Sequence, residues 1–220
     1  MNNTLLSNNN SALRVRHLGL TDYSNTWRQM SDFTNQRQRD TVDELWLLEH
    51  QPVFTFGQAG KPEHLLDPHS IPVVKSDRGG QVTYHGPGQL IAYPLISLQG
   101  LHLGVRGFVD RIEQCLIKTL ADFAIEAERR QGAPGVYVKN AKIAALGLRL
   151  RHGYTFHGLS LNVAMDLTPF QWINPCGYAG LAVTQIADLI EQSPPNVAAV
   201  STVLSRHFCQ LFDYIPVSDD

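Results

Sequence analysis

The most glycine-dense stretch of the chain, residues 78–89, restricts the path of the backbone more than any other segment. It lacks both the G-x-G-x-x-G pattern and the Gly-Lys-Ser/Thr end of a phosphate-binding loop, so nucleotide binding is not indicated. Glycine allows the backbone to approach a ligand closely. Side chains that can donate hydrogen bonds lie along the stretch at Arg78, Thr83, Tyr84 and His85. The stretch therefore predicts either a substrate-binding loop or a tight turn with solvated polar residues.

Periodicity in the remaining sequence indicates three main helices and several short strands. Apolar residues recur at helical spacing in residues 21–37, 108–123 and 200–211, and a further short helix ends near residue 190. Residues 58–70 predict a loop. Strand-like runs occupy residues 44–50, 53–57, 71–75 and 90–96, the last placed near a sheet edge or bulge by Pro94, and residues 136–138, 142–149 and 154–163 predict a three-stranded meander.

Composition is that of an ordinary globular protein. The 220 residues are 43% hydrophobic and 17% charged with a net charge of −2, so we expect one catalytic domain over residues 13–220 and no nucleic-acid partner. The Asn- and Ser-rich start, residues 1–12, predicts a flexible segment without signal-peptide character. No apolar run approaches the ~20 residues that cross a bilayer. Three cysteines favour a reducing cytoplasm and no disulfide.

Two of the cysteines are expected on helices, Cys115 of these in the core, and the third is a candidate nucleophile. Cys115 lies on the apolar face of a predicted helix, and Cys209 lies beside the apolar stripe of another. Cys176 stands between Pro175 and Gly177 in a segment without helical or strand periodicity, which predicts display on a turn. Taken alone, the segment favours the alternative, a cysteine packed as a small hydrophobe in that turn.

A cysteine nucleophile reacts as the thiolate, and a nearby cation lowers the pKa of a thiol. Lys142 opens an otherwise apolar strand, so an inward side chain would be desolvated and able to transfer protons. An outward, solvated lysine is the alternative. The nine histidines show no metal-binding spacing, and His85 and His157 are either polar groups of a pocket or satisfied core histidines.

Four ordered motifs together resemble one family. Residues 78–89, Lys-Ile-Ala-Ala-Leu-Gly at 142–147, His-Gly-Leu-Ser-Leu-Asn at 157–162 and Pro-Cys-Gly at 175–177 are similar to those of the lipoyl(octanoyl) transferases. The resemblance implies an α/β fold, a mixed β-sheet flanked by helices as in biotin and lipoate protein ligases. It implies catalysis by Cys176, as acyl-thioester nucleophile, and Lys142. It also implies a substrate-binding set of Arg78, Gly79, Gly80, Gln81, Val82, Thr83, Tyr84, His85, Ala145, Leu146, Gly147, Gly158, Leu159 and Ser160.

By the same resemblance, the substrates are proteins. The donor would be octanoyl-acyl carrier protein, and the acceptors would be lipoyl domains of 2-oxoacid dehydrogenase E2 subunits and the glycine cleavage H protein. No metal, no cofactor and no membrane are implied, and we expect a monomer. Ser160 stands where alanine is expected, which bears on chain-length preference.

An acidic acyl carrier protein would bind to a basic surface patch. The alternative is that the basic residues in these loops are only solvated and bind no carrier. The candidate residues are Arg129, Arg130, Arg149, Arg151 and His152. Three other functions stay open: an ATP-dependent lipoate or biotin ligase, a cysteine hydrolase of acyl thioesters, and a non-catalytic acyl or lipoyl-domain binding protein.

Overall fold

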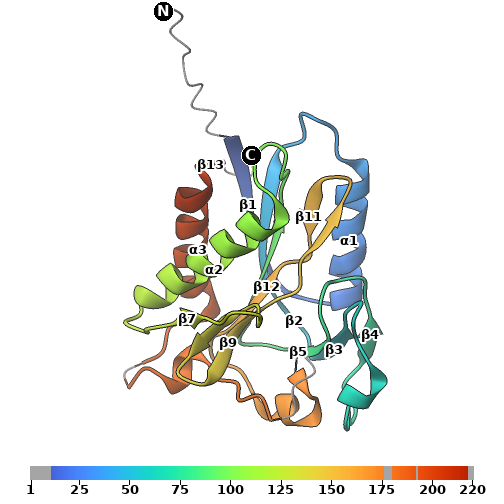
Figure 1. Cartoon of the computed structure of the whole chain (residues 1–220), viewed down its shortest axis with the longest axis vertical. Helices are drawn as coiled ribbons and strands as arrows, with labels where there is room; N and C mark the ends of the chain where they lie inside the picture. The colour runs from blue at the N-terminus through green and yellow to red at the C-terminus, as the bar shows by residue number, and fades with distance from the viewer. Residues whose placement is uncertain (1–10, 176–179, 192, 218–220) are drawn as a thin grey trace, which may run out of the picture.

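The computed structural model describes residues 11–175, 180–191 and 193–217, which form three layers (Figure 1). A mixed sheet lies between helix α1 (Tyr23–Gln36) on one face and helices α2 (Val105–Ala121) and α3 (Val197–Phe212) on the other. The predicted class, a mixed β-sheet flanked by helices, is confirmed.

The large sheet has eight strands among the described residues, in the order β13-β1-β2-β6-β12-β9-β8-β7. Strand β1 pairs in parallel with both β13 and β2, and the other neighbouring pairs are antiparallel. In chain order the strands are β1 (Ser11–Thr21), β2 (Asp43–His50), β6 (Gln89–Leu95), β7 (Glu128–Arg129), β8 (Val136–Val138), β9 (Ala141–Leu146), β12 (Leu159–Asn162) and β13 (Tyr214–Val217).

Two smaller sheets lie beside the large one. Strands β4 (Val73–Lys75), β3 (Val53–Phe56) and β5 (Val82–His85) form one, with β3 in the centre. Strands β10 (Arg149–Arg151) and β11 (Tyr154–Phe156) form a hairpin. Single 3-10 turns connect other parts, at Pro62–His64, Thr168–Trp172 and Ile186–Asp188.

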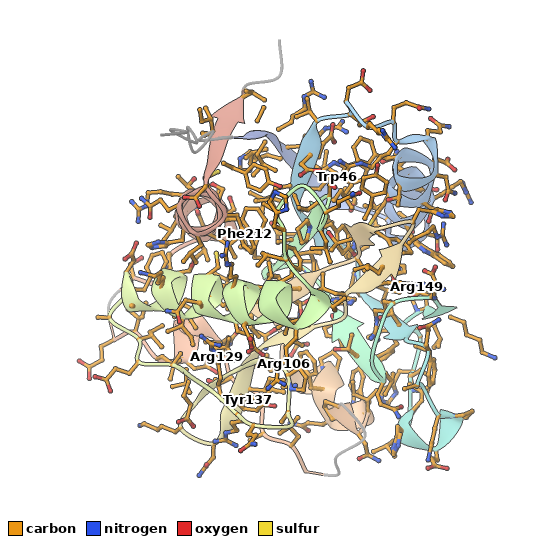
Figure 2. All side chains as sticks on the ribbon, turned by 45° about the horizontal axis from the view of Figure 1, so that its top comes forward. Trp46, Arg106, Arg129, Tyr137, Arg149 and Phe212 are labelled. Atoms are coloured by element: carbon orange, nitrogen blue, oxygen red, sulfur yellow. The ribbon has the colours of Figure 1, made fainter. Side chains whose placement is uncertain are left out.

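Apolar side chains fill both spaces between the layers (Figure 2). Between the sheet and α2 and α3, the rings of Phe108 and Phe212 lie 5.2 Å apart. On the opposite face, Met30 of α1 packs into a cluster that includes Trp46. Cys115 is 1% exposed in the first of these spaces, and burial raises the pKa of its thiol to about 12. The prediction of a core position for Cys115 is confirmed. Cys209 lies on a helix, α3, as predicted, and is buried there.

Helix starts follow the expected capping chemistry. The side chain of Asp22 accepts a hydrogen bond from the backbone N–H of Asn25 at the start of α1, and Asn196 does the same for Ala199 at the start of α3. These bonds satisfy backbone donors that have no partner inside the helix. The predicted helices at 21–37, 108–123 and 200–211 are confirmed, each within a few residues.

Two predictions of local structure are wrong. Strand β6 is central rather than an edge, because β2 and β12 pair with its two sides. Pro94 is tolerated because the pairing with β12 ends at Ala92. The runs 142–149 and 154–163 are not continuous strands. The chain leaves the large sheet after Leu146, forms the β10–β11 hairpin, and returns at Leu159, so β8, β9 and β12 are the predicted meander with a hairpin inserted.

Candidate functional site

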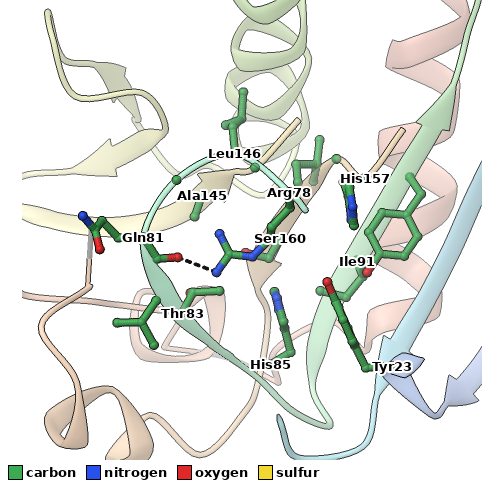
Figure 3. A pocket seen from close by; sticks show the side chains of 16 residues that line it. Tyr23, Arg78, Gln81, Thr83, His85, Ile91, Ala145, Leu146, His157 and Ser160 are labelled. Atoms are coloured by element: carbon green, nitrogen blue, oxygen red, sulfur yellow. Dashed lines mark hydrogen bonds between the residues drawn. The ribbon is translucent and has the colours of Figure 1, made fainter. Parts of the chain in front are cut away.

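A cavity of about 60 Å³ lies where the glycine-rich stretch crosses the adjoining ends of β9 and β12 (Figure 3). All residues of the predicted substrate-binding set line it except Gly79 and Tyr84. Four further residues complete the wall: Tyr23, Ile91, Tyr93 and His157. Three segments distant in sequence therefore meet at one cavity, and α1 contributes a residue that the motifs do not include.

Arg78 holds the glycine-rich stretch in place. Its guanidinium, in a residue 7% exposed, donates to Thr55 Oγ1 at 2.9 Å, Thr55 O at 2.6 Å, Gly79 O at 2.8 Å and Gln81 O at 2.5 Å. The end of β3 packs closely against the stretch, because a Cβ on Gly57 would lie 2.3 Å from Gly80 O. Arg78 thus fastens the stretch to β3 while it lines the cavity.

Gly79 and Tyr84 face away from the cavity. A Cβ on Gly79 would lie 2.8 Å from Leu148 O, so the glycine-rich stretch packs directly against the backbone of Leu148. Tyr84 is buried against Phe54 and Phe170, with ring centroids at 5.4 and 5.7 Å. Both residues shape the wall from behind.

Asp77 and His157 form a hydrogen-bonded pair at one side of the cavity. His157 Nε2 lies 2.8 Å from Asp77 Oδ1, and Trp27 Nε1 donates to the same oxygen at 3.0 Å. Burial opposes ionisation of Asp77, but the bonds and charges of His157, Trp27 and Arg149 prevail and lower its pKa to about 2. Burial lowers the pKa of His157, against the opposing effect of Asp77. The neutral ring therefore donates through Nε2.

His85 and Tyr93 line the cavity, and His50 lies behind Tyr93. Burial lowers the pKa of His50 to about 4 and that of His85 to about 3, and it raises the pKa of Tyr93 well above its ordinary value. His50 Nε2 lies 2.7 Å from Tyr93 Oη, and His85 Nδ1 lies 2.7 Å from Gln89 Oε1. At neutral pH these residues supply hydrogen-bonding groups without histidine charge.

Lys142 is buried, so the alternative of an outward, solvated lysine is wrong. Its side chain belongs to a residue 6% exposed, and Nζ donates to Pro134 O at 3.0 Å. The backbone of Lys142 pairs with residues 182–184. Lys142 N donates to Ala182 O at 2.8 Å, and Thr184 N donates to Lys142 O at 3.0 Å.

A second small cavity adjoins the first and is lined by Lys142. It is lined by Lys142 and Pro175 and shares Thr83, Ala145 and Ser160 with the larger cavity. Cys176, the predicted nucleophile, lies outside the described residues. The preceding residue, Pro175, is buried and lines the second cavity together with Lys142.

The candidate basic patch is divided between two elements (Figure 2). Arg149 and Arg151 on the β10–β11 hairpin bond Asp77, through its backbone oxygen at 2.8 Å and its carboxylate at 3.1 Å respectively. Arg129 on β7 donates to Gln114 of α2 at 2.9 Å. Arg149 and Arg151 therefore support the cavity wall.

Within residues 11–175, 180–191 and 193–217, no group of three or more His, Cys, Asp or Glu side chains could hold a metal ion. None of the helices in that part of the chain has the length and apolar character needed to span a membrane.

Comparisons with known proteins agree on the family. Residues 22–209 match the family model of the lipoyl protein ligase A/B catalytic domain. A relative from Cellvibrio japonicus, named octanoyltransferase, is 62% identical over 202 residues, which are 92% of this chain and 94% of the relative.

Solved structures of lower sequence identity share the fold. The bipartite lipoate protein ligase from Thermoplasma acidophilum superposes with a TM-score of 0.74 at 15% identity, covering 96% of this chain and 88% of that chain. Biotin protein ligase from Aquifex aeolicus superposes with a TM-score of 0.59 at 10% identity, covering 90% and 70%.

Proposed function

Because the chain belongs to the lipoyl protein ligase A/B catalytic domain family, we propose that it is an octanoyltransferase acting through an acyl-thioester on Cys176. The observation that carries the proposal is the buried Lys142 at one end of two adjoining cavities, beside the residue that precedes Cys176. Octanoyl-acyl carrier protein is the donor, and a lysine of a lipoyl domain is the acceptor.

In the first half-reaction, Lys142 takes the proton of the Cys176 thiol. The thiolate attacks the carbonyl carbon of the donor thioester, so a new carbon–sulfur bond forms as the bond to the carrier breaks. The ammonium of Lys142 then returns the proton to the carrier thiolate. One thioester replaces another, and no ATP is consumed.

In the second half-reaction, the acceptor amine attacks the acyl-enzyme and loses a proton to Lys142. An amide forms and Cys176 leaves as the thiolate, beside the ammonium that stabilises it. The same pair of residues therefore serves both halves. Lipoyl domains of 2-oxoacid dehydrogenase E2 subunits and the glycine cleavage H protein supply such lysines, in a cytoplasmic reaction of a monomeric enzyme.

Strand β9, which runs from Lys142 to the wall of the larger cavity, is long enough to lie along an acyl chain. From Lys142 to Leu146, four residues along β9 cover about 13 Å at ~3.3 Å per residue. The seven carbon–carbon bonds of an extended octanoyl group, each ~1.5 Å in a zigzag, cover about 9 Å. Ile91, Ala145 and Leu159 supply apolar wall, and each buried methylene contributes ~0.8 kcal/mol of binding.

Intact-mass measurement after incubation with octanoyl-acyl carrier protein tests the proposal. The expected product is one octanoyl adduct on Cys176, which is discharged onto a lipoyl domain without ATP. Cys176→Ala should lose adduct and transfer, whereas Cys209→Ala, a matched change at a buried helical cysteine, should keep both. No adduct on the wild type, or transfer only with ATP and free octanoate, contradicts the proposal.

A further inference from the structure

Lys142 Nζ lies in a socket formed by the chain that leads into β8. Pro134 O accepts a hydrogen bond from Nζ at 3.0 Å, and the centroid of the Tyr137 ring lies 5.2 Å from Nζ. Lysine has three donors on Nζ, so fixing one of them sets the directions of the other two. The position of the Pro134 carbonyl therefore decides where the ammonium points.

Gly135 allows this close approach. Its φ is +129°, a conformation that other residues rarely adopt. A Cβ at this position would lie 2.6 Å from Ala144 O, 3.1 Å from Lys142 Cε and 3.3 Å from Lys142 Nζ. The register between β8 and β9 also shifts at Val136/Tyr137, which brings Tyr137 opposite Lys142.

A buried carboxylate fixes the loop. Glu113 of α2 is 6% exposed, and its Oε1 accepts the backbone N–H of Gly135 at 2.8 Å. Its other oxygen, Oε2, lies 4.0 Å from Arg129 Nε. A carboxylate is costly to bury beside apolar neighbours unless hydrogen bonds compensate. The proposed chemistry does not use Glu113 directly.

We propose that Glu113 is a positioning residue for Lys142: by holding Gly135 N–H it fixes the Pro134 carbonyl, which aims the Lys142 ammonium toward the nucleophile. The inference rests on the proposed function, since Lys142 has to act on Cys176. Helix α2 is thereby linked to the reacting groups through one side chain and two consecutive backbone groups, without itself contacting substrate.

Two substitutions separate the reach of the side chain from its charge. Glu113→Asp keeps the charge but shortens the side chain by one methylene, whereas Glu113→Gln keeps an acceptor oxygen at the same reach. Asp110→Ala is the matched control, because Asp110 lies one turn earlier on α2 and also pairs with Arg129, at 3.7 Å. Thermal unfolding of each variant distinguishes loss of the fold from a change in the orientation of the Lys142 ammonium.

The deciding readout is the pH dependence of Cys176 alkylation by iodoacetamide, together with kcat and KM for the octanoyl donor. Glu113→Asp should raise the apparent pKa of the thiol by about one unit and lower kcat about tenfold with KM nearly unchanged, because a fixed cation lowers a thiol pKa. Glu113→Gln and Asp110→Ala should keep the wild-type profile. An unchanged profile in Glu113→Asp, or an equal shift in Glu113→Gln, overturns the inference.

Lys142→Ala, measured in parallel, distinguishes this inference from the proposed function. If Lys142→Ala leaves the alkylation profile of Cys176 unchanged, the Cys176/Lys142 pairing itself is wrong. If Lys142→Ala shifts the profile and Glu113→Asp does not, the pairing stands and only the role of Glu113 is wrong.

Discussion

The pair formed by Asp77 and His157 predicts a specific dependence of stability on pH. Replacement of Asp77 by Asn keeps an oxygen for His157 Nε2, which lies 2.8 Å from Asp77 Oδ1, but removes the carboxylate charge. It also removes the anion that Arg151 approaches at 3.1 Å. The variant thus tests the charge of Asp77 with little change of shape.

The magnitude follows from the pKa of Asp77, which falls from 3.8 to about 2 in the fold. At ~1.36 kcal/mol per pKa unit, this difference corresponds to ~2.4 kcal/mol. Because the carboxylate is partly exposed, solvent screening reduces the expected value to about 1–1.5 kcal/mol. The folded pKa lies below the unfolded one, so this contribution is complete above about pH 4 and is lost as the pH falls toward 2.

Urea unfolding of the wild type and Asp77→Asn measures the effect at about pH 7 and about pH 3. The variant should be less stable by about 1–1.5 kcal/mol at neutral pH, and about half of that difference should disappear at pH 3. Asp110→Asn, at a side chain 54% exposed, controls for the loss of one negative charge. An equal difference between wild type and Asp77→Asn at both pH values would refute the reasoning.

The remaining four predictions concern packing and burial. Gly158→Ala should lower the free energy of unfolding by about 3 kcal/mol, because the new Cβ would lie 2.0 Å from Ala92 O. Gly107→Ala, within α2, should raise the free energy of unfolding by about 0.5–1 kcal/mol, because the nearest atom to its Cβ is 3.6 Å away and alanine favours the helix. Urea unfolding measures both. Phe108→Ala should lower the midpoint of unfolding through a loss of about 3–5 kcal/mol, and a loss under 1 kcal/mol would contradict its place in the core. Cys115 should remain unmodified by iodoacetamide at pH 8 until the chain unfolds, since burial raises its thiol pKa to about 12; mapping of alkylated peptides with and without urea checks this.

Elements whose pattern is set by burial were predictable from the sequence. Strands β2, β3 and β6 are buried along nearly their whole length, so their apolar runs are visible without neighbours. Strand β1 was missed because its charged residues obscure the pattern. Arg14 and Arg16 contact Glu44 of the adjacent strand at 3.1 and 3.5 Å, a pairing that no local signal predicts.

The residues of the cavity are predictable from the sequence only where they lie in motifs. Its glycines and small residues lie in motifs, but Tyr23 belongs to the apolar stripe of the helix predicted at residues 21–37, a pattern that does not indicate a cavity. The stripe is real, yet the start of α1 approaches the cavity, where Tyr23 stacks on His85 at 6.1 Å between ring centroids. An approach between distant segments leaves no periodic signal. The burial of Lys142 likewise depends on pairing with residues 182–184.

The parallel pairing of β1 with β13 affects the nascent chain. Ser11 lies beside Tyr214, so the outer edge of β1 has no partner until the last strand leaves the ribosome. At ~5–20 residues per second, that interval lasts about 10–40 s. An unpaired edge recruits strands from other chains, and charged side chains discourage such pairing. Strand β1 carries two charged side chains, Arg14 and Arg16, a feature that disfavours pairing with other chains before β13 is synthesised.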